Sequence, residues 1–235
     1  MLAVNDLEAF YGSSYIIQKI NLKVKKGQGV ALLGRNGAGK STILKSIINI
    51  EPKVKGNIVF NDQSIRGLKP YQLVRMGLGY VPEDRRIYSS LSVKENLEMG
   101  KYGRRRSNVS SFSIEEMLNL FPLMNKFINR RGGQLSGGEQ QVVTIARTLA
   151  AKPSIVLLDE PTEGLAPIIV NSLVDVIQKV IKEMGVGILL AEQNVTFSRK
   201  LTQYVYLLDQ GQIIFEGTWD EFDKRPDLKE TYLAV

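Results

Sequence analysis

The chain has 235 residues, a length typical of one compact unit that carries at most a subdomain. It contains neither cysteine nor histidine, which excludes disulfides, thiolate nucleophiles, histidine-based catalytic triads and zinc sites built from these ligands. The net charge of +7 favours anionic partners such as phosphates, nucleic acid or an anionic membrane surface.

The first 34 residues have the pattern of short strands. Apolar and polar residues alternate over Ile20–Val24, which predicts a half-buried strand, and the apolar run Gly29–Gly34 predicts a fully buried one. Apolar residues at helical spacing predict an amphipathic helix over Ser41–Ile50. Two more strands are expected at Asn57–Phe60 and Leu78–Val81.

Residues 85–135 are polar, basic and predicted to be mostly helical. Ser92 with Glu95, and Ser113 with Glu116, have the spacing of helix capping boxes. We therefore expect an inserted helical subdomain over this range.

Alternating helices and strands resume after the insertion. In chain order we expect a helix over Ser136–Ala151, a strand over Ile155–Leu158, a helix over Pro167–Glu183, a strand over Val186–Leu190, a hairpin of Tyr204–Leu208 with Gln212–Phe215, and a packed helical tail over Thr218–Val235. This alternation predicts an α/β fold with a mostly parallel sheet covered on both faces. One domain, 1–235, would then contain a core of residues 1–84 and 136–235 and the helical insertion 85–135.

The segment Gly34–Ser41 fits the phosphate-loop pattern G-x-x-x-x-G-K-S. It follows a buried strand and opens a helix, so backbone N–H groups and the positive end of the helix dipole can face phosphate oxygens. Lys40 is expected to reach the β- and γ-phosphates of a nucleotide, and Ser41 to ligate Mg²⁺. The expected nucleotide-binding residues of this loop are Gly34, Arg35, Asn36, Gly37, Ala38, Gly39, Lys40, Ser41 and Thr42.

Asp159 and Glu160 follow an apolar strand and are expected at the carboxyl edge of the sheet, where open α/β sheets bind ligands. Asp159 would hold Mg²⁺ through water, and Glu160 would polarise the attacking water. A second loop, Ser136–Gly138, opens a helix with two adjacent glycines and also suits phosphate. One nucleotide does not need two such loops unless the second loop serves a neighbouring subunit.

Together, segments 34–42, 135–141 and 155–162 resemble the Walker A, signature and Walker B segments of ABC-type ATPase subunits in order and spacing. The resemblance implies a P-loop NTPase fold: a RecA-like, mostly parallel sheet, an N-terminal antiparallel β subdomain and an inserted helical subdomain. It also implies a head-to-tail dimer that sandwiches two ATP molecules. Each ATP would lie between one subunit's phosphate loop and the partner's signature residues, here Ser136, Gly137, Gly138 and Glu139.

Tyr11 stands where an aromatic residue stacks on adenine in this family, with Tyr15 as the competing candidate. The alternative for Tyr11 is a strand tyrosine that packs at the edge of the core.

Three positions depart from the family's general pattern. Glu83 stands where most members have glutamine, and it could still ligate Mg²⁺ or its water. Gln193 stands where most have a switch histidine; it can donate a hydrogen bond to a γ-phosphate oxygen but cannot carry charge. The usual dimer-loop aspartate is replaced within Glu163–Pro167. Because Glu160 is intact, hydrolysis is expected, with more of the transition-state stabilisation falling on Lys40 and Mg²⁺.

As a set, these departures resemble the second ATPase subunit of branched-chain amino acid importers and of similar amide or urea importers. The implied function is to energise uptake of branched-chain or other hydrophobic amino acids. The implied partners are a second ATPase subunit, identical or different, transmembrane permease subunits and, indirectly, a substrate-binding protein. The permeases would dock near Glu83–Ser90.

The expected location is the cytoplasmic face of the inner membrane, as a peripheral subunit. No apolar run approaches the about 18 residues of a spanning helix, and the N-terminal residues lack the pattern of a secretory signal.

Two other functions remain as alternatives. A lipopolysaccharide-type exporter subunit is disfavoured because such subunits usually keep the glutamine and histidine that this chain lacks. A soluble ABC protein acting on nucleic acid or ribosomes is suggested by the positive charge and the cluster Lys101, Arg104, Arg105 and Arg106. Charge runs usually form a solvated surface, and soluble relatives generally carry two cassettes or a coiled-coil insertion, so no nucleic-acid partner is expected.

Overall fold

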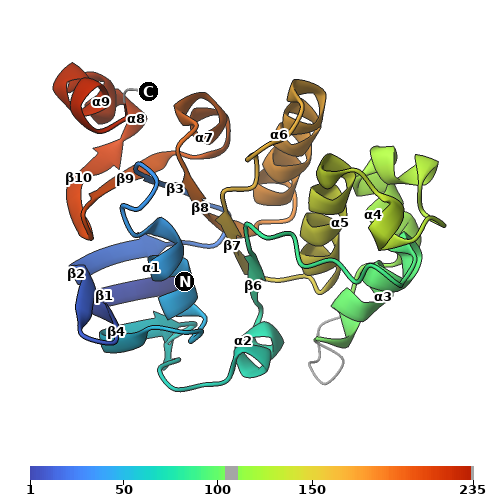
Figure 1. Cartoon of the computed structure of the whole chain (residues 1–235), viewed down its shortest axis with the longest axis horizontal. Coiled ribbons are helices and arrows are strands. Elements are labelled where there is room, and N and C mark those ends of the chain that lie inside the picture. Colours follow the sequence, from blue (N-terminus) through green and yellow to red (C-terminus); the bar gives the residue numbers. More distant parts are fainter. Residues whose placement is uncertain (104–110, 234–235) are drawn as a thin grey trace.

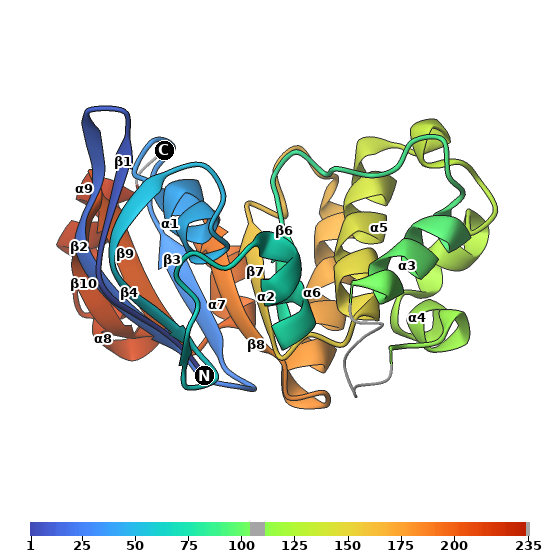
Figure 2. The same ribbon diagram turned by 90° about the horizontal axis from the view of Figure 1, so that it is seen from below.

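The computed structural model describes residues 1–103 and 111–233 and contains two β-sheets with helix α1 (Lys40–Ile47) between them (Figures 1 and 2). The smaller sheet is antiparallel, in the order β2 (Ser14–Val24), β1 (Leu2–Tyr11), β4 (Lys53–Phe60) and β5 (Gln63–Ser64). The larger sheet has the order β10 (Gln212–Thr218), β9 (Tyr204–Asp209), β3 (Gly29–Leu33), β8 (Gly187–Glu192), β7 (Ile155–Asp159) and β6 (Leu78–Val81). Its strands run parallel except for the β9–β10 hairpin, which confirms the predicted α/β class.

The strands of the larger sheet supply side chains to two separate cores, because successive side chains of a strand point to opposite faces. Leu157 of β7 packs on the face that α1 covers, together with Ile43. Its neighbours Val156 and Leu158 pack on the other face, against α5 (Gly137–Ala150) and α6 (Pro167–Lys182). A parallel sheet buried on both faces explains why its strands are continuous apolar runs rather than alternating ones.

The carboxyl ends of three parallel strands meet at one edge of the larger sheet. In the register of the sheet, Leu33 of β3 pairs with Glu192 of β8, and Asp159 of β7 pairs with Ala191 of β8. The phosphate-loop segment, the acidic pair and Gln193 each follow one of these strand ends. The topology therefore brings these three sequence features to the same edge.

Helices α3 (Val93–Tyr102) and α4 (Ile114–Leu120), with the 3-10 turns η1 (Pro122–Lys126) and η2 (Gly132–Gln134), lie between β6 and α5 in the chain. Both predicted capping boxes are confirmed: Ser92 with Glu95 and Ser113 with Glu116 exchange reciprocal hydrogen bonds. These helices gather beside α5, at the end of the molecule away from the smaller sheet (Figure 1). Of the basic cluster considered above, Arg104–Arg106 lie outside the described residues.

Helix α1 ends at Ile47, earlier than its apolar periodicity suggested. Asn49 adopts a left-handed backbone, with φ of 56°, and stops the helix. Its side-chain amide donates to the carbonyls of Ile65 at 2.7 Å and Leu68 at 2.9 Å. These bonds to a distant loop are tertiary contacts, which the local pattern does not contain.

Two short helices were not predicted from the sequence, α2 (Pro70–Met76) and α7 (Val195–Leu201). Each has seven residues, too few for a clear helical period. Their start signals were available, since Pro70 occupies the first turn of α2 and the Asn194 side chain caps α7 by accepting from the Phe197 N–H.

The tail forms α8 (Trp219–Asp223) and α9 (Pro226–Tyr232), which confirms the predicted packed helical end. It packs against β3 and β9 of the larger sheet. Fully buried Phe222 contacts a cluster with residues from β3 and β9. Asp223 accepts hydrogen bonds from Arg199 and Lys229, which hold its pKa well below the usual range.

Replacing Phe222 by Ala is expected to lower the free energy of unfolding by about 3–5 kcal/mol, because the large cavity cannot collapse in a closely packed core. Urea denaturation followed by circular dichroism measures this change. Ile168→Ala is the control, since Ile168 is 77% exposed and its truncation should cost less than about 0.5 kcal/mol. Equal effects of the two substitutions would show that the tail is not part of the cooperative core.

Candidate active site

A polar cavity of about 300 Å³ opens at the carboxyl edge of the larger sheet. It is lined by Ile16, Asn36, Gly37, Gly39, Lys40, Ser41, Thr42, Glu83 and Glu160. All of these except Ile16 were candidate site residues from the sequence. Ile16 belongs to β2 of the smaller sheet, and no local pattern marks it, because only the packing of the two sheets brings it here.

The loop between β3 and α1 takes its shape from backbone conformations that suit glycine. Gly37 and Gly39 have φ of 83° and 111°. A side chain on Gly39 would also lie only 2.6 Å from Ile17 Cδ1, so this position needs glycine for space as well as for conformation. The Gly211 N–H donates to the Ala38 carbonyl at 3.0 Å, which ties the loop to the β9–β10 turn.

Lys40 is almost fully buried at the start of α1, and its ammonium lies inside the curl of the loop. Nζ donates to the carbonyls of Gly34 at 2.8 Å and Arg35 at 3.0 Å. It also forms an ion pair with Glu160 Oε1 at 2.9 Å. The ammonium group is therefore held at the cavity wall, beside backbone N–H groups of the loop. The ammonium and these N–H groups can bind one phosphate together.

Ser41 and Asp159 form a compact oxygen pair next to Lys40. Ser41 Oγ donates to Asp159 Oδ1 at 2.8 Å, and the Tyr80 hydroxyl donates to Asp159 Oδ2 at 3.1 Å. Burial raises the pKa of Asp159, whereas these two hydrogen bonds oppose the rise. Burial and the adjacent carboxylate also raise the pKa of Tyr80, so this phenol remains a proton donor. A hydroxyl and a carboxylate at this spacing fit Mg²⁺, although the described residues contain no ready cluster of three acidic ligands.

Glu160 has a strained backbone, with φ of 43° directly after β7. Its N–H donates to the Ala191 carbonyl of β8 at 2.9 Å, so the neighbouring strand holds it in this conformation. Left-handed backbone is uncommon for residues other than glycine, and such strain concentrates at functional sites. The strain directs a carboxylate toward Lys40 at the mouth of the cavity.

Glu83 also lines the cavity and contacts Glu163, for which the sequence predicted no role. Partial burial and the Glu163 carboxyl group raise the pKa of Glu83, and Asp159 and Glu160 add to the rise. So many carboxylates around one cavity favour the binding of a cation there.

Gln193 begins the turn after β8 and faces the phosphate loop. Its Nε2 donates to Asn36 Oδ1 at 2.6 Å. Buried Glu192 fixes this turn, because its Oε2 accepts the N–H groups of Gln193 and Asn194, both at 3.0 Å. This positioning role of Glu192 was not predicted from the sequence, although a carboxylate at a strand end is a visible signal.

The signature residues do not line the cavity; they lie at the start of α5, beside α6. Ser136 and Glu139 form a capping box, with the Ser136 N–H donating to Glu139 Oε2 at 2.8 Å. A Cβ on Gly138 would lie 3.2 Å from Ile169 of α6. The two candidate phosphate-binding loops of this chain, 34–42 and 136–138, therefore do not form one site: the first lines the cavity and the second lies outside it.

Tyr11 and Tyr15 also lie beyond the cavity lining. The Tyr11 hydroxyl donates to Glu51 Oε2 at 3.3 Å and interacts with Thr42, which does line the cavity. Tyr15 stacks on Phe10, with ring centroids 4.7 Å apart. Both rings are exposed, at 38% and 43%, and Tyr11 is the one linked to the phosphate loop.

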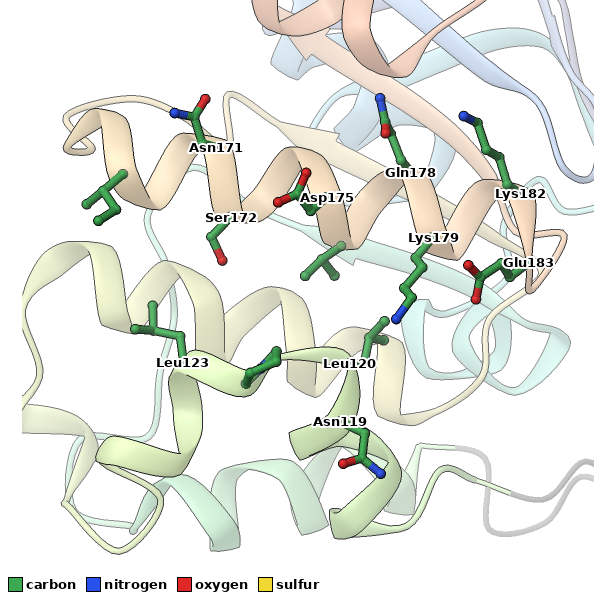
Figure 3. Close-up of a pocket in the computed structure, with 13 residues that line it drawn as sticks. Asn119, Leu120, Leu123, Asn171, Ser172, Asp175, Gln178, Lys179, Lys182 and Glu183 are labelled. Atoms are coloured by element: carbon green, nitrogen blue, oxygen red, sulfur yellow. The ribbon is translucent and has the colours of Figure 1, made fainter.

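A larger hollow of about 720 Å³ separates α6 from the α4–η1 segment (Figure 3). Ser172 and Lys179 of α6 point into it, and Leu120 and Leu123 line the opposite side. It has none of the phosphate-loop geometry, so the smaller cavity is the candidate for nucleotide.

Residues 17–163 match the family described as ABC transporter. The chain is 36% identical over 234 residues to the high-affinity branched-chain amino acid transport ATP-binding protein BraG of Pseudomonas aeruginosa, with 100% of both chains covered. The chain belongs to the ABC transporter family. As a member of it, the chain is an ATPase and binds ATP.

Other relatives of this ABC ATPase are also described as ATP-binding proteins of transport systems. It is 34% identical over 235 residues to the probable branched-chain amino acid transport ATP-binding protein LivF of Archaeoglobus fulgidus, covering 100% of this chain and 99% of the relative. It is also 34% identical over 238 residues to the lipopolysaccharide export system ATP-binding protein LptB of Escherichia coli, covering 99% and 97%. The similarity to BraG and LivF confirms the resemblance to branched-chain importer subunits inferred from the sequence.

Solved structures confirm the cassette fold. The ATP-binding subunit of an ABC transporter superposes with a TM-score of 0.82 at 27% identity, covering 99% of this chain and 96% of that one. A dimeric, post-hydrolysis state of the ATP-binding cassette MJ0796, bound to ADP and Pi, has a TM-score of 0.81 at 26% identity, covering 93% and 98%.

Proposed function

We propose that this ABC ATPase energises the import of branched-chain or other hydrophobic amino acids. The observation that carries the proposal is one cavity that gathers a phosphate loop, a magnesium-type oxygen pair and a strained glutamate, in a chain similar along its whole length to BraG and LivF. The ATP cycle would close and reopen a pair of ATPase subunits.

Within the cavity, backbone N–H groups of the loop 34–42 would bind the triphosphate, with Lys40 on the β- and γ-phosphates. Ser41 and Asp159, with Glu83 of the cavity lining, would hold Mg²⁺ directly or through water. When bound, this ion neutralises charge on the phosphates. Glu160 would orient and polarise the attacking water, and Tyr11 would support the adenine from beside Thr42.

Gln193 would replace its bond to Asn36 with one to the γ-phosphate. Substituting Gln193 by Ala is expected to lower kcat about 10-fold, because a single neutral donor to the transition state is lost. The ATP dissociation constant should stay within about 2-fold, because the loop provides most ground-state contacts. Phosphate release and fluorescent-nucleotide titration measure the two quantities. A large loss of ATP affinity with unchanged kcat would assign Gln193 to binding instead.

A second ATPase subunit would complete each site. Ser136–Glu139 lie away from the chain's own cavity, which is what a head-to-tail partner requires. The sandwich would place these residues, at the positive end of α5, against the partner's γ-phosphate. The subunit pair can be two copies of this chain or this chain with a sister subunit.

The permease subunits would dock where the helical insertion 85–135 meets the core. A hollow of about 260 Å³ there is lined in part by Tyr80, Tyr88 and Met99. Tyr88 in this lining is about half exposed, and so are Tyr71 of α2 and Tyr102 of α3, the two helices that also contribute Val74 and Met99 to the lining. Among the described residues, no helix has the length and apolarity needed to cross a bilayer. Docked on the permeases, as expected for a relative of BraG, the chain would be a peripheral subunit at the cytoplasmic face of the inner membrane.

A lipopolysaccharide-type exporter subunit is the second candidate, favoured by the similarity to LptB. Reconstitution decides between the two. The chain is assembled in proteoliposomes with the permease, sister-ATPase and binding-protein subunits encoded beside it, and ATP-dependent uptake of labelled leucine, isoleucine or valine is measured. Uptake that needs ATP and all subunits supports the proposal. Export of lipid, or uptake of amides or urea alone, would replace it.

A further inference from the structure

Arg85 lies on the segment between β6 and α3 and contacts three other parts of the chain. Its backbone is left-handed, with φ of 59°, an uncommon conformation for a residue with a side chain. Its carbonyl accepts a hydrogen bond from Thr144 Oγ1 of α5. The segment is thereby anchored to the helix that the signature residues begin.

The Arg85 guanidinium lies between two glycines from two different motifs. Nη2 donates to the Glu163 carbonyl at 3.0 Å in the loop after the acidic pair. A Cβ on Gly137 would be only 2.3 Å from Nη1, and a Cβ on Gly164 would be 3.5 Å from Nη2. Any side chain at position 137 would therefore displace the guanidinium. The planar guanidinium fills the space between the signature turn (Ser136–Gly138) and the loop 163–165.

This contact is not explained by simple charge attraction. A cation beside the N-terminus of α5 faces the positive end of the helix dipole, which is unfavourable. Two residues earlier, Glu83 lines the nucleotide cavity and contacts the Glu163 side chain. Glu83 and Arg85 thus link one cavity wall to the loop 163–165, and Arg85 continues the link to the signature turn.

We propose that Arg85 is a positioning residue that holds the signature turn and the loop 163–165 of one subunit at a fixed separation. Both surfaces then meet the partner's nucleotide site together. This inference rests on the proposed function, because it assumes the ATP-sandwich dimer. Its structural part, the coupling of the two loops through one guanidinium, concerns a single chain and needs no partner.

The test compares Arg85→Ala and Arg85→Lys with Arg86→Ala as the matched control. Arg86 carries the same charge one residue along, but its side chain bonds to Asp84. Hydrogen–deuterium exchange of the nucleotide-free chain should show faster exchange in both 136–140 and 162–166 for Arg85→Ala. The rest of the chain, and all of Arg86→Ala, should exchange like the parent.

Activity gives the second readout, measured on the chain with its cognate ATPase partner. Arg85→Ala should lower kcat about 10-fold, with the ATP dissociation constant of the isolated chain within about 2-fold of the parent and Tm within about 2 °C. Arg85→Lys should recover part of the lost kcat. The lysine ammonium can reach the Glu163 carbonyl but cannot fill the space that the planar guanidinium occupies.

Faster exchange in only one of the two loops, or unchanged exchange in both, would overturn the inference. Unchanged kcat beside altered exchange would overturn its functional part. A global fall in Tm with faster exchange throughout would reduce Arg85 to an ordinary structural contact. If the parent chain binds no ATP, the proposed function fails separately, and the exchange data still decide whether Arg85 couples the loops.

Discussion

Glu160→Gln is expected to lower ATP turnover by about 10²–10⁴-fold while leaving ATP binding intact. The substitution keeps the shape of the side chain and one oxygen that can accept a hydrogen bond from Lys40. In the parent chain, Glu160 Oε1 lies 2.9 Å from Lys40 Nζ. It removes the charge that would polarise water and accept its proton. Because Glu160 is held in a strained backbone by β8, the amide should occupy nearly the same place.

Two measurements check this expectation. Phosphate release from Mg-ATP reports turnover, and size-exclusion chromatography with ATP reports the trapped subunit pair, which should accumulate because reopening needs hydrolysis. Glu115→Gln, at the exposed start of α4, is the control and should behave like the parent. Normal phosphate release by Glu160→Gln would remove Glu160 from the catalytic role.

Lys40→Ala is expected to weaken ATP binding by about 10²–10³-fold, the equivalent of about 3–4 kcal/mol. Lys40 is the buried cation of the phosphate loop, and its removal costs the charge-assisted hydrogen bonds to the phosphates. It also leaves the carboxylate of Glu160 facing the triphosphate without its ion pair, which adds repulsion. Hydrolysis should become undetectable at ATP concentrations that saturate the parent.

Titration with a fluorescent ATP analogue measures the affinity of the Lys40 variant. Lys182→Ala, at the far end of α6, removes the same charge from the chain and should bind like the parent. Adenosine binding, which needs no phosphate contact, should be equal in all three proteins. An unchanged ATP dissociation constant for Lys40→Ala would show that the nucleotide does not enter this loop.

The order of residues by itself determined which segments carry the chemistry. The phosphate loop is one contiguous stretch, and its glycines at 37 and 39 adopt the positive φ that the pattern requires. Capping boxes such as Ser92 with Glu95 were visible for the same reason, since their partners are three residues apart. Local backbone geometry depends on neighbouring residues, so a sequence pattern can specify it.

The early end of α1 at Asn49 and the place of Ile16 in the cavity wall depend on contacts between distant segments. The short helices α2 and α7 are a different case, because their start signals lie in the sequence but seven residues are too few for a clear helical period. The Asn49 side chain, where α1 stops, donates hydrogen bonds to the carbonyls of Ile65 and Leu68. Ile16 lines the cavity from β2 of the smaller sheet, whereas the phosphate loop follows a strand of the larger sheet. In both cases a contact between distant segments overrides or supplements what the local pattern expresses.

The tertiary structure alone decided how the site is assembled. Ser41 meets Asp159 across 118 residues, Gln193 meets Asn36, and Arg85 fits between Gly137 and Gly164. Parallel strands bring their carboxyl ends to one edge whatever the length of chain between them, so these meetings depend on strand order rather than on spacing. Composition and motif order thus defined an ATPase of the ABC type, whereas the packing of β3, β7 and β8 defined which side chains face one another within it.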